Sequence, residues 1–129
     1  DALAEHNKKL RGAKVAILGV AFLENSDDTR NTPSAVIYAE LQRRGARPVL
    51  HDPIVGDFDL PFTKDLDKAV AGAAAVVLST KHREYVGLDL KNLRKTLATP
   101  VLVDGRNAFT SESARKAGLT YKGVGKGRR

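Results

Sequence analysis

The chain lacks cysteine altogether, and it is poor in aromatic residues and in long apolar runs. Without cysteine it has no disulfide, no thiolate metal ligand and no cysteine nucleophile. Aromatic residues make up 5% of the sequence and do not alternate with basic ones, which argues against a surface that stacks nucleic-acid bases. No apolar run reaches the roughly 18 residues that span a bilayer. We therefore expect a cytoplasmic protein that binds neither nucleic acid nor membrane.

Apolar runs typical of buried strands alternate with stretches typical of helices. Strands are predicted at 14–20, 47–51, 74–80, 100–105 and, as an edge strand, 119–124. Helices are predicted at 33–45, 64–72, 88–98 and 111–118. This order, with short connections, predicts an α/β fold: a doubly wound, mainly parallel Rossmann-like sheet in a three-layer αβα arrangement. We expect one domain over 12–129, with residues 1–11 as the tail of a helix that connects from upstream.

The loop after the first strand lacks the glycines of a dinucleotide-binding fingerprint. Its sequence, GVAFLENSDDTRNTPS, holds only Gly19 where a glycine-rich turn would hold a pyrophosphate. This argues against a free-standing NAD-binding domain. Ligands of open α/β sheets bind at the carboxyl ends of the strands, where the strand order reverses. If the five strands lie in the order 3-2-1-4-5, this loop faces the loop DGRNAF (104–109) across one crevice.

Several polar residues have structural interpretations that compete with functional ones. Asp52, in an Asp-Pro pair, is more typical of a turn than of a ribose ligand. His82 is more typical of a capping or exposed histidine than of a catalytic one, and the three histidines lack ligand spacing, so no metal is expected. Arg30 follows two aspartates and could order its loop. Arg106, behind Gly105 at a strand end, could hold an anion or stack on a base.

The segment LGVAFLENSDDTRNTPS (18–34) resembles a motif of nucleotide-sugar 6-dehydrogenases, written roughly LG-x-AFK-x-x-x-DD-x-R-E-S-P. HDP (51–53), STKHREY (79–85) and DGRN (104–107) match further segments of that family in order and spacing. The resemblance covers about residues 12–125. It implies that the chain is the C-terminal, UDP-sugar-binding domain of a UDP-glucose, UDP-N-acetylmannosamine or GDP-mannose 6-dehydrogenase.

The resemblance also implies what the rest of such an enzyme does. An upstream Rossmann domain binds NAD, and a central region carries the catalytic cysteine. The whole enzyme, expected to be a homo-oligomer through its full-length chain, oxidises a UDP-hexose to the UDP-uronic acid for polysaccharide biosynthesis. This chain has neither the cysteine nor the NAD domain, so we expect it to bind no cofactor and to be inactive alone. Its expected partners are the UDP-sugar and the upstream domains.

Four substrate-binding residues follow from the resemblance. Phe22 would lie against the nucleotide, and Arg106 would reach the substrate from the opposite loop. Arg30 matches the motif arginine, and we expect it to fix the conformation of its loop rather than to bind the substrate directly. The family lysine after the phenylalanine is replaced by Leu23, which would line the crevice or face the core. The missing charge would then come from another basic residue, or the substrate would be placed differently.

A function of another class is also compatible with this fold. The chain could be a non-catalytic nucleotide-binding or receiver-like module. A receiver needs an acidic residue at the end of its third strand, and the sequence there reads Ser79-Thr80-Lys81. The sequence therefore favours the substrate-binding domain.

Overall fold

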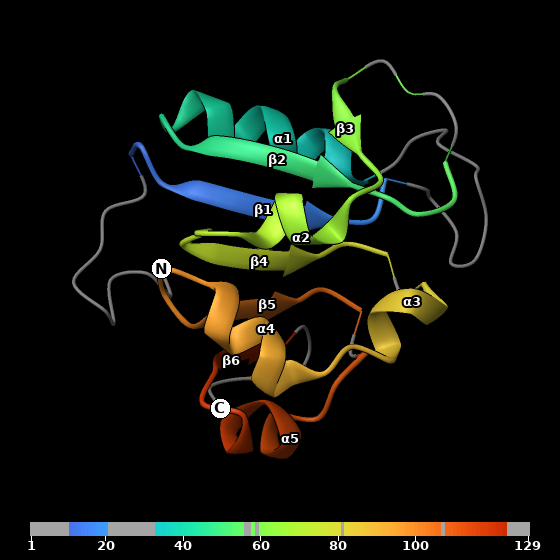
Figure 1. Ribbon diagram of the computed structural model, residues 1–129. Helices are drawn as coiled ribbons and strands as arrows, with labels where there is room; N and C mark the ends of the chain where they lie inside the picture. The colour runs from blue at the N-terminus through green and yellow to red at the C-terminus, as the bar shows by residue number, and fades with distance from the viewer. Residues whose placement is uncertain are drawn as a thin grey trace.

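The computed structural model describes residues 11–20, 33–55, 58, 60–80, 82–106 and 108–123. Within them, six parallel strands form one open sheet in the order β3-β2-β1-β4-β5-β6 (Figure 1). The strands are β1 (Lys14–Leu18), β2 (Arg47–His51), β3 (Phe62–Thr63), β4 (Ala75–Leu78), β5 (Val101–Asp104) and β6 (Thr120–Gly123). The predicted α/β fold class and all five predicted strands are confirmed, although the predicted strands are mostly longer than those observed.

The predicted order of the strands is wrong, because the short strand β3 was not predicted from the sequence. The strand predicted at 100–105 was expected to adjoin the first strand, but β4 lies between them and pairs with both. In the numbering of the structure, which includes β3, the order 3-2-1-4-5 is present. In that numbering the strand predicted as the third is β4, and the strand predicted as the fourth is β5. The strand order therefore reverses between β1 and β4, and the loops after these two strands flank the reversal.

Helices cover both faces of the sheet (Figure 1). They are α1 (Pro33–Arg43), α2 (Leu66–Val70), α3 (Arg83–Val86), α4 (Leu90–Thr96) and α5 (Ser111–Lys116). The side chains of Asp65, Asp89 and Thr110 accept hydrogen bonds from backbone N–H groups in the first turns of α2, α4 and α5, which explains where these helices begin. None of the described helices is long and apolar enough to cross a membrane.

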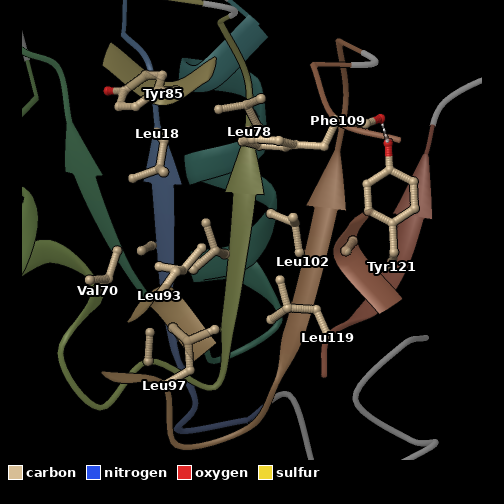
Figure 2. Packing of buried hydrophobic residues seen from close by; sticks show 14 residues of the cluster. Leu18, Val70, Leu78, Tyr85, Leu93, Leu97, Leu102, Phe109, Leu119 and Tyr121 are labelled. Atoms are coloured by element: carbon tan, nitrogen blue, oxygen red, sulfur yellow. Dashed lines mark hydrogen bonds between the residues drawn. The ribbon is translucent and has the colours of Figure 1, made fainter. Parts of the chain in front are cut away.

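Alternating side chains of the strands divide the core between the two faces. On β1, Ala16 and Leu18 belong to the larger cluster. The same cluster, shown in Figure 2, includes Leu93 of α4 and Leu97, which directly follows α4. Ile17 belongs to the opposite face, where α1 packs. Because both faces of β1 are covered, its sequence is apolar from Val15 to Leu18, as in buried parallel strands.

Candidate functional site

The strand register brings the carboxyl ends of the central strands to one level. Leu18 of β1 lies opposite His51 of β2 and Leu78 of β4, and β5 continues the same register. The first residues beyond these strands therefore share one edge of the sheet: Gly19, Asp52, Ser79 and Gly105. In doubly wound sheets this edge binds ligands, at the point where the strand order reverses.

Two glycines allow the loops at this edge to pack closely. Gly19 has a φ of 108°, and a Cβ atom there would lie 2.5 Å from the Cβ atom of Thr80. A Cβ atom on Gly105 would lie 2.9 Å from the carbonyl oxygen of Leu78. The backbone that leaves β4 is therefore packed between the backbones that leave β1 and β5. The single glycine in the loop after the first strand is thus needed for packing against the neighbouring loop.

Arg106 is an exposed residue whose guanidinium is held at one nitrogen. Its Nε atom donates to the carbonyl oxygen of Ser79 at 3.0 Å, and its backbone N–H donates to Oδ1 of Asp104 at 3.1 Å. In the part of the chain that the structure describes, no residue accepts a hydrogen bond from either terminal nitrogen of Arg106. An oriented guanidinium with two donors available is suited to bind an anion such as a phosphate.

The loop that carries Arg106 is fixed from below by a buried carboxylate. Oδ2 of Asp104 accepts from the backbone N–H of Phe109 at 2.9 Å and from the hydroxyl of Tyr121 at 2.8 Å. The same hydroxyl lies 2.8 Å from the carbonyl oxygen of Phe109, the bond drawn in Figure 2. Burial, and then the hydrogen bond to Asp104, raise the pKa of Tyr121, which therefore keeps its proton. The position of Arg106 thus depends on packed, buried neighbours.

Asp52 is a fully buried carboxylate that joins three loops at this edge. Its Oδ1 atom accepts from the backbone N–H groups of Ile54 and Val55 at 2.8 and 2.9 Å, which confirms the predicted turn. Its Oδ2 atom accepts from the backbone N–H of Val20 at 2.8 Å, and it lies 2.8 Å from Nε2 of His82. Because an ionised carboxylate only accepts, Nε2 of His82 carries a proton.

His82 therefore differs from its sequence-based interpretation. It occupies the N-cap position of α3, but its side chain makes no capping hydrogen bond and is fully buried. The exposed histidine that we considered is wrong. The imidazole is instead directed to Asp52, thirty residues earlier in the chain.

A second buried pair, His51 and Tyr85, packs beside the first. Nε2 of His51 lies 3.2 Å from the carbonyl oxygen of Lys64, so this nitrogen donates. In a neutral ring Nδ1 then accepts from the hydroxyl of Tyr85 at 2.7 Å. Burial lowers the pKa of His51 and raises that of Tyr85, so both groups are held neutral. The ring of Tyr85 also lies 5.7 Å from that of His82, between centroids.

Ser79 carries a buried hydroxyl with no hydrogen-bond partner in the described part of the structure. Its backbone N–H donates to the carbonyl oxygen of Leu18 at 2.9 Å, and its own carbonyl oxygen holds Arg106. A hydroxyl left unpaired in this way is unusual in a protein interior. It lies next to the reversal of the strand order, between β1 and β5.

Only one of the four residues predicted to contact the substrate lies among the described residues, and its contact with a substrate stays a prediction. Arg106 lies at the expected edge, whereas Phe22, Leu23 and Arg30 lie outside the described residues. Sequence reasoning missed the pairing of Asp52 with His82, although both belong to the segments HDP and STKHREY that carried the resemblance. No group of three or more potential ligands that could hold a metal occurs among the described side chains.

Comparison with known proteins shows the family to which the chain is related. Residues 16–111 match the UDP-glucose/GDP-mannose dehydrogenase family, UDP binding domain. UDP-glucose 6-dehydrogenase of Rhizobium meliloti (strain 1021) is 35% identical over 123 residues, which are 91% of this chain and 28% of that protein.

Solved structures of related enzymes have the same fold. The NDP-N-acetyl-D-galactosaminuronic acid dehydrogenase of Methanosarcina mazei Go1 superposes with a TM-score of 0.91 at 36% identity, over 95% of this chain and 26% of that one. The UDP-D-ManNAc dehydrogenase of Pyrococcus horikoshii gives 0.86 at 29% identity, over 98% and 28%. The chain thus spans little more than a quarter of these relatives. It belongs to the UDP-glucose/GDP-mannose dehydrogenase family, in which it corresponds to the UDP-binding domain.

Proposed function

We propose that this chain binds the nucleotide end of a UDP-sugar at the carboxyl edge of its sheet, as one domain of an NAD-dependent nucleotide-sugar 6-dehydrogenase. The observation that carries the proposal is Arg106, which follows β5 and is held through Nε by Ser79 of the loop after β4, next to the reversal of the strand order, with its terminal nitrogens available. A guanidinium in this position binds a diphosphate through charge-assisted hydrogen bonds. The names of the related enzymes support a UDP-sugar as the ligand.

The remaining parts of the proposal concern the longer protein. The oxidation of the sugar to the uronic acid, with NAD as the hydride acceptor, would take place where the other domains meet this one. This chain has no cysteine, so the nucleophile of the reaction would come from outside it. Its own task would be to bind and orient the nucleotide, with Phe22, Leu23 and Arg30 as proposed further contacts. We propose a cytoplasmic homo-oligomer as the working form of the full-length enzyme and no enzymatic activity for this chain alone.

Titration calorimetry with UDP, UMP and NAD tests the proposal directly. UDP should bind, UMP should bind more weakly because it lacks one phosphate, and NAD should not bind. Arg106→Ala should weaken UDP binding at least tenfold, since a charge-assisted hydrogen bond contributes about 1.5–3 kcal/mol. Arg115→Ala is the matched control, because Arg115 is exposed on the last turn of α5. Binding of NAD without UDP, or equal UDP affinity in all three proteins, would overturn the proposal.

A further inference from the structure

We propose that Asp52 and His82 form a positioning pair, which fixes Val20, at the end of β1, relative to the loops after β2 and β4 at the edge of the sheet that binds the nucleotide. This inference rests on the proposed function, since it concerns residues that act on the same edge of the sheet. Neither residue is exposed: both side chains are fully buried, so they would act through the backbone they hold.

The pair controls the point at which the chain leaves β1. Val20 is buried two residues after the end of β1. Its N–H donates to Oδ2 of Asp52, the same atom that accepts from Nε2 of His82. An oxygen that accepts two hydrogen bonds cannot move toward one donor without lengthening the other. The position of Val20 is therefore coupled to the position of the imidazole.

The loop after β4 extends this coupling to Arg106. Three of its residues contact three different parts of the edge: the carbonyl of Ser79 holds Arg106, the side chain of Thr80 lies against Gly19, and His82 pairs with Asp52. Displacement of His82 would thus change the support of Arg106 as well as that of Val20. A single buried pair sets the relative position of the loops after β1, β2 and β4.

Asp52 uses Oδ1 for the turn and Oδ2 for His82, so a substitution can remove the contact with His82 and keep the turn. In Asp52→Asn, the amide oxygen can still accept from Ile54 and Val55, which preserves the turn. The amide nitrogen then faces the N–H of Val20, and two donors cannot bond each other. His82→Ala removes the imidazole and leaves the carboxylate buried without one of its donors. In His82→Gln, the amide nitrogen can take the place of Nε2, so this variant should restore the bond.

The experiment measures UDP affinity and the exchange of the Val20 amide proton in the isolated chain. We expect His82→Ala and Asp52→Asn to weaken UDP binding about tenfold and to speed Val20 exchange by a similar factor. His82→Gln should restore both to within about threefold of the wild type. Leu93→Ala is the control for general destabilisation, because Leu93 lies in the core on α4, away from these contacts. It should leave the UDP affinity of the folded protein unchanged.

Two results would overturn the inference: unchanged affinity in folded His82→Ala, or loss of affinity that His82→Gln does not restore. If His82→Ala does not fold, Asp52→Asn and His82→Asn, whose shorter amide cannot reach Asp52, take its place. If the wild type does not bind UDP, the proposed function fails. In that case the exchange rate of the Val20 amide proton tests by itself whether the pair fixes Val20. An unchanged exchange rate in Asp52→Asn would refute the positioning role of the pair.

Discussion

The Nε atom of Arg106 lies 3.0 Å from the carbonyl oxygen of Ser79, and this bond joins the loops after β5 and β4. It fixes the plane of the guanidinium before any ligand arrives. The conformational entropy that a free arginine side chain loses on binding is therefore partly lost in folding already. Such preorganisation favours an arginine over other cations at this position.

Arg106→Lys should weaken UDP binding nearly as much as Arg106→Ala. A lysine has one nitrogen, which cannot both bond the carbonyl of Ser79 and donate to a phosphate in the arrangement of a guanidinium. We expect a loss of about tenfold, measured by calorimetry at constant ionic strength. A lysine variant with the affinity of the wild type would show that only the charge of Arg106 matters.

Gly19→Ala should destabilise the chain more strongly than Gly72→Ala. Both glycines have positive φ, but a Cβ atom on Gly19 would overlap Thr80, whereas no described atom lies within 4 Å of that on Gly72. Backbone strain alone costs about 1–2 kcal/mol. Overlap should bring the loss at Gly19 to about 3 kcal/mol or more. Urea denaturation measures both, and equal losses would contradict the close packing of the loops after β1 and β4.

The stability of the chain should fall below neutral pH because of His51. Burial lowers its pKa in the folded state, so between that value and the unfolded pKa of about 6.5 the unfolded chain binds the extra proton. The contribution is fully present above pH 6.5 and is lost as the pH falls, by at most about 1.4 kcal/mol per pH unit. His51→Asn removes this titration and leaves an oxygen that can accept from Tyr85.

Urea denaturation at pH 7.5 and 5.5 isolates the contribution of His51. The wild type should lose more stability than His51→Asn between these values, by at most about 1.4 kcal/mol, because every other titrating group is common to both proteins. Equal losses would show that His51 takes up its proton as easily in the folded state as in the unfolded one.

The sequence predicted most of the sheet because buried parallel strands leave a strong signal. The strands β1, β4 and β5 are continuous apolar runs, and the helices between them end at glycines such as Gly45, Gly72 and Gly118. The strand Phe62–Thr63 and the helix Arg83–Val86 were not predicted, since segments of two and four residues are too short to show a periodic pattern. The strand order was misassigned for that reason alone.

The site was predictable only in part because its contacts join distant parts of the chain. The turn at Asp52 is local, and its sequence pattern indicated it correctly. The bond from Asp52 to His82 joins residues 30 apart in the sequence, and no local pattern indicates it. Arg106 was placed at the right edge by topology, but its anchor on Ser79 was not foreseen. The roles of Phe22, Leu23 and Arg30 stay predictions.

The bond between Asp52 and His82 also has a consequence for how the domain opens. Asp52 follows β2, in the half of the sheet that holds β3, β2 and β1, and His82 follows β4, in the other half. Separation of the halves would break this bond together with the pairing of β1 with β4, and it would expose the apolar side chains that both halves share, such as Leu18 and Leu78. The two halves therefore behave as one cooperative unit, and slowly exchanging amides in β2 and β5 should share one exchange free energy.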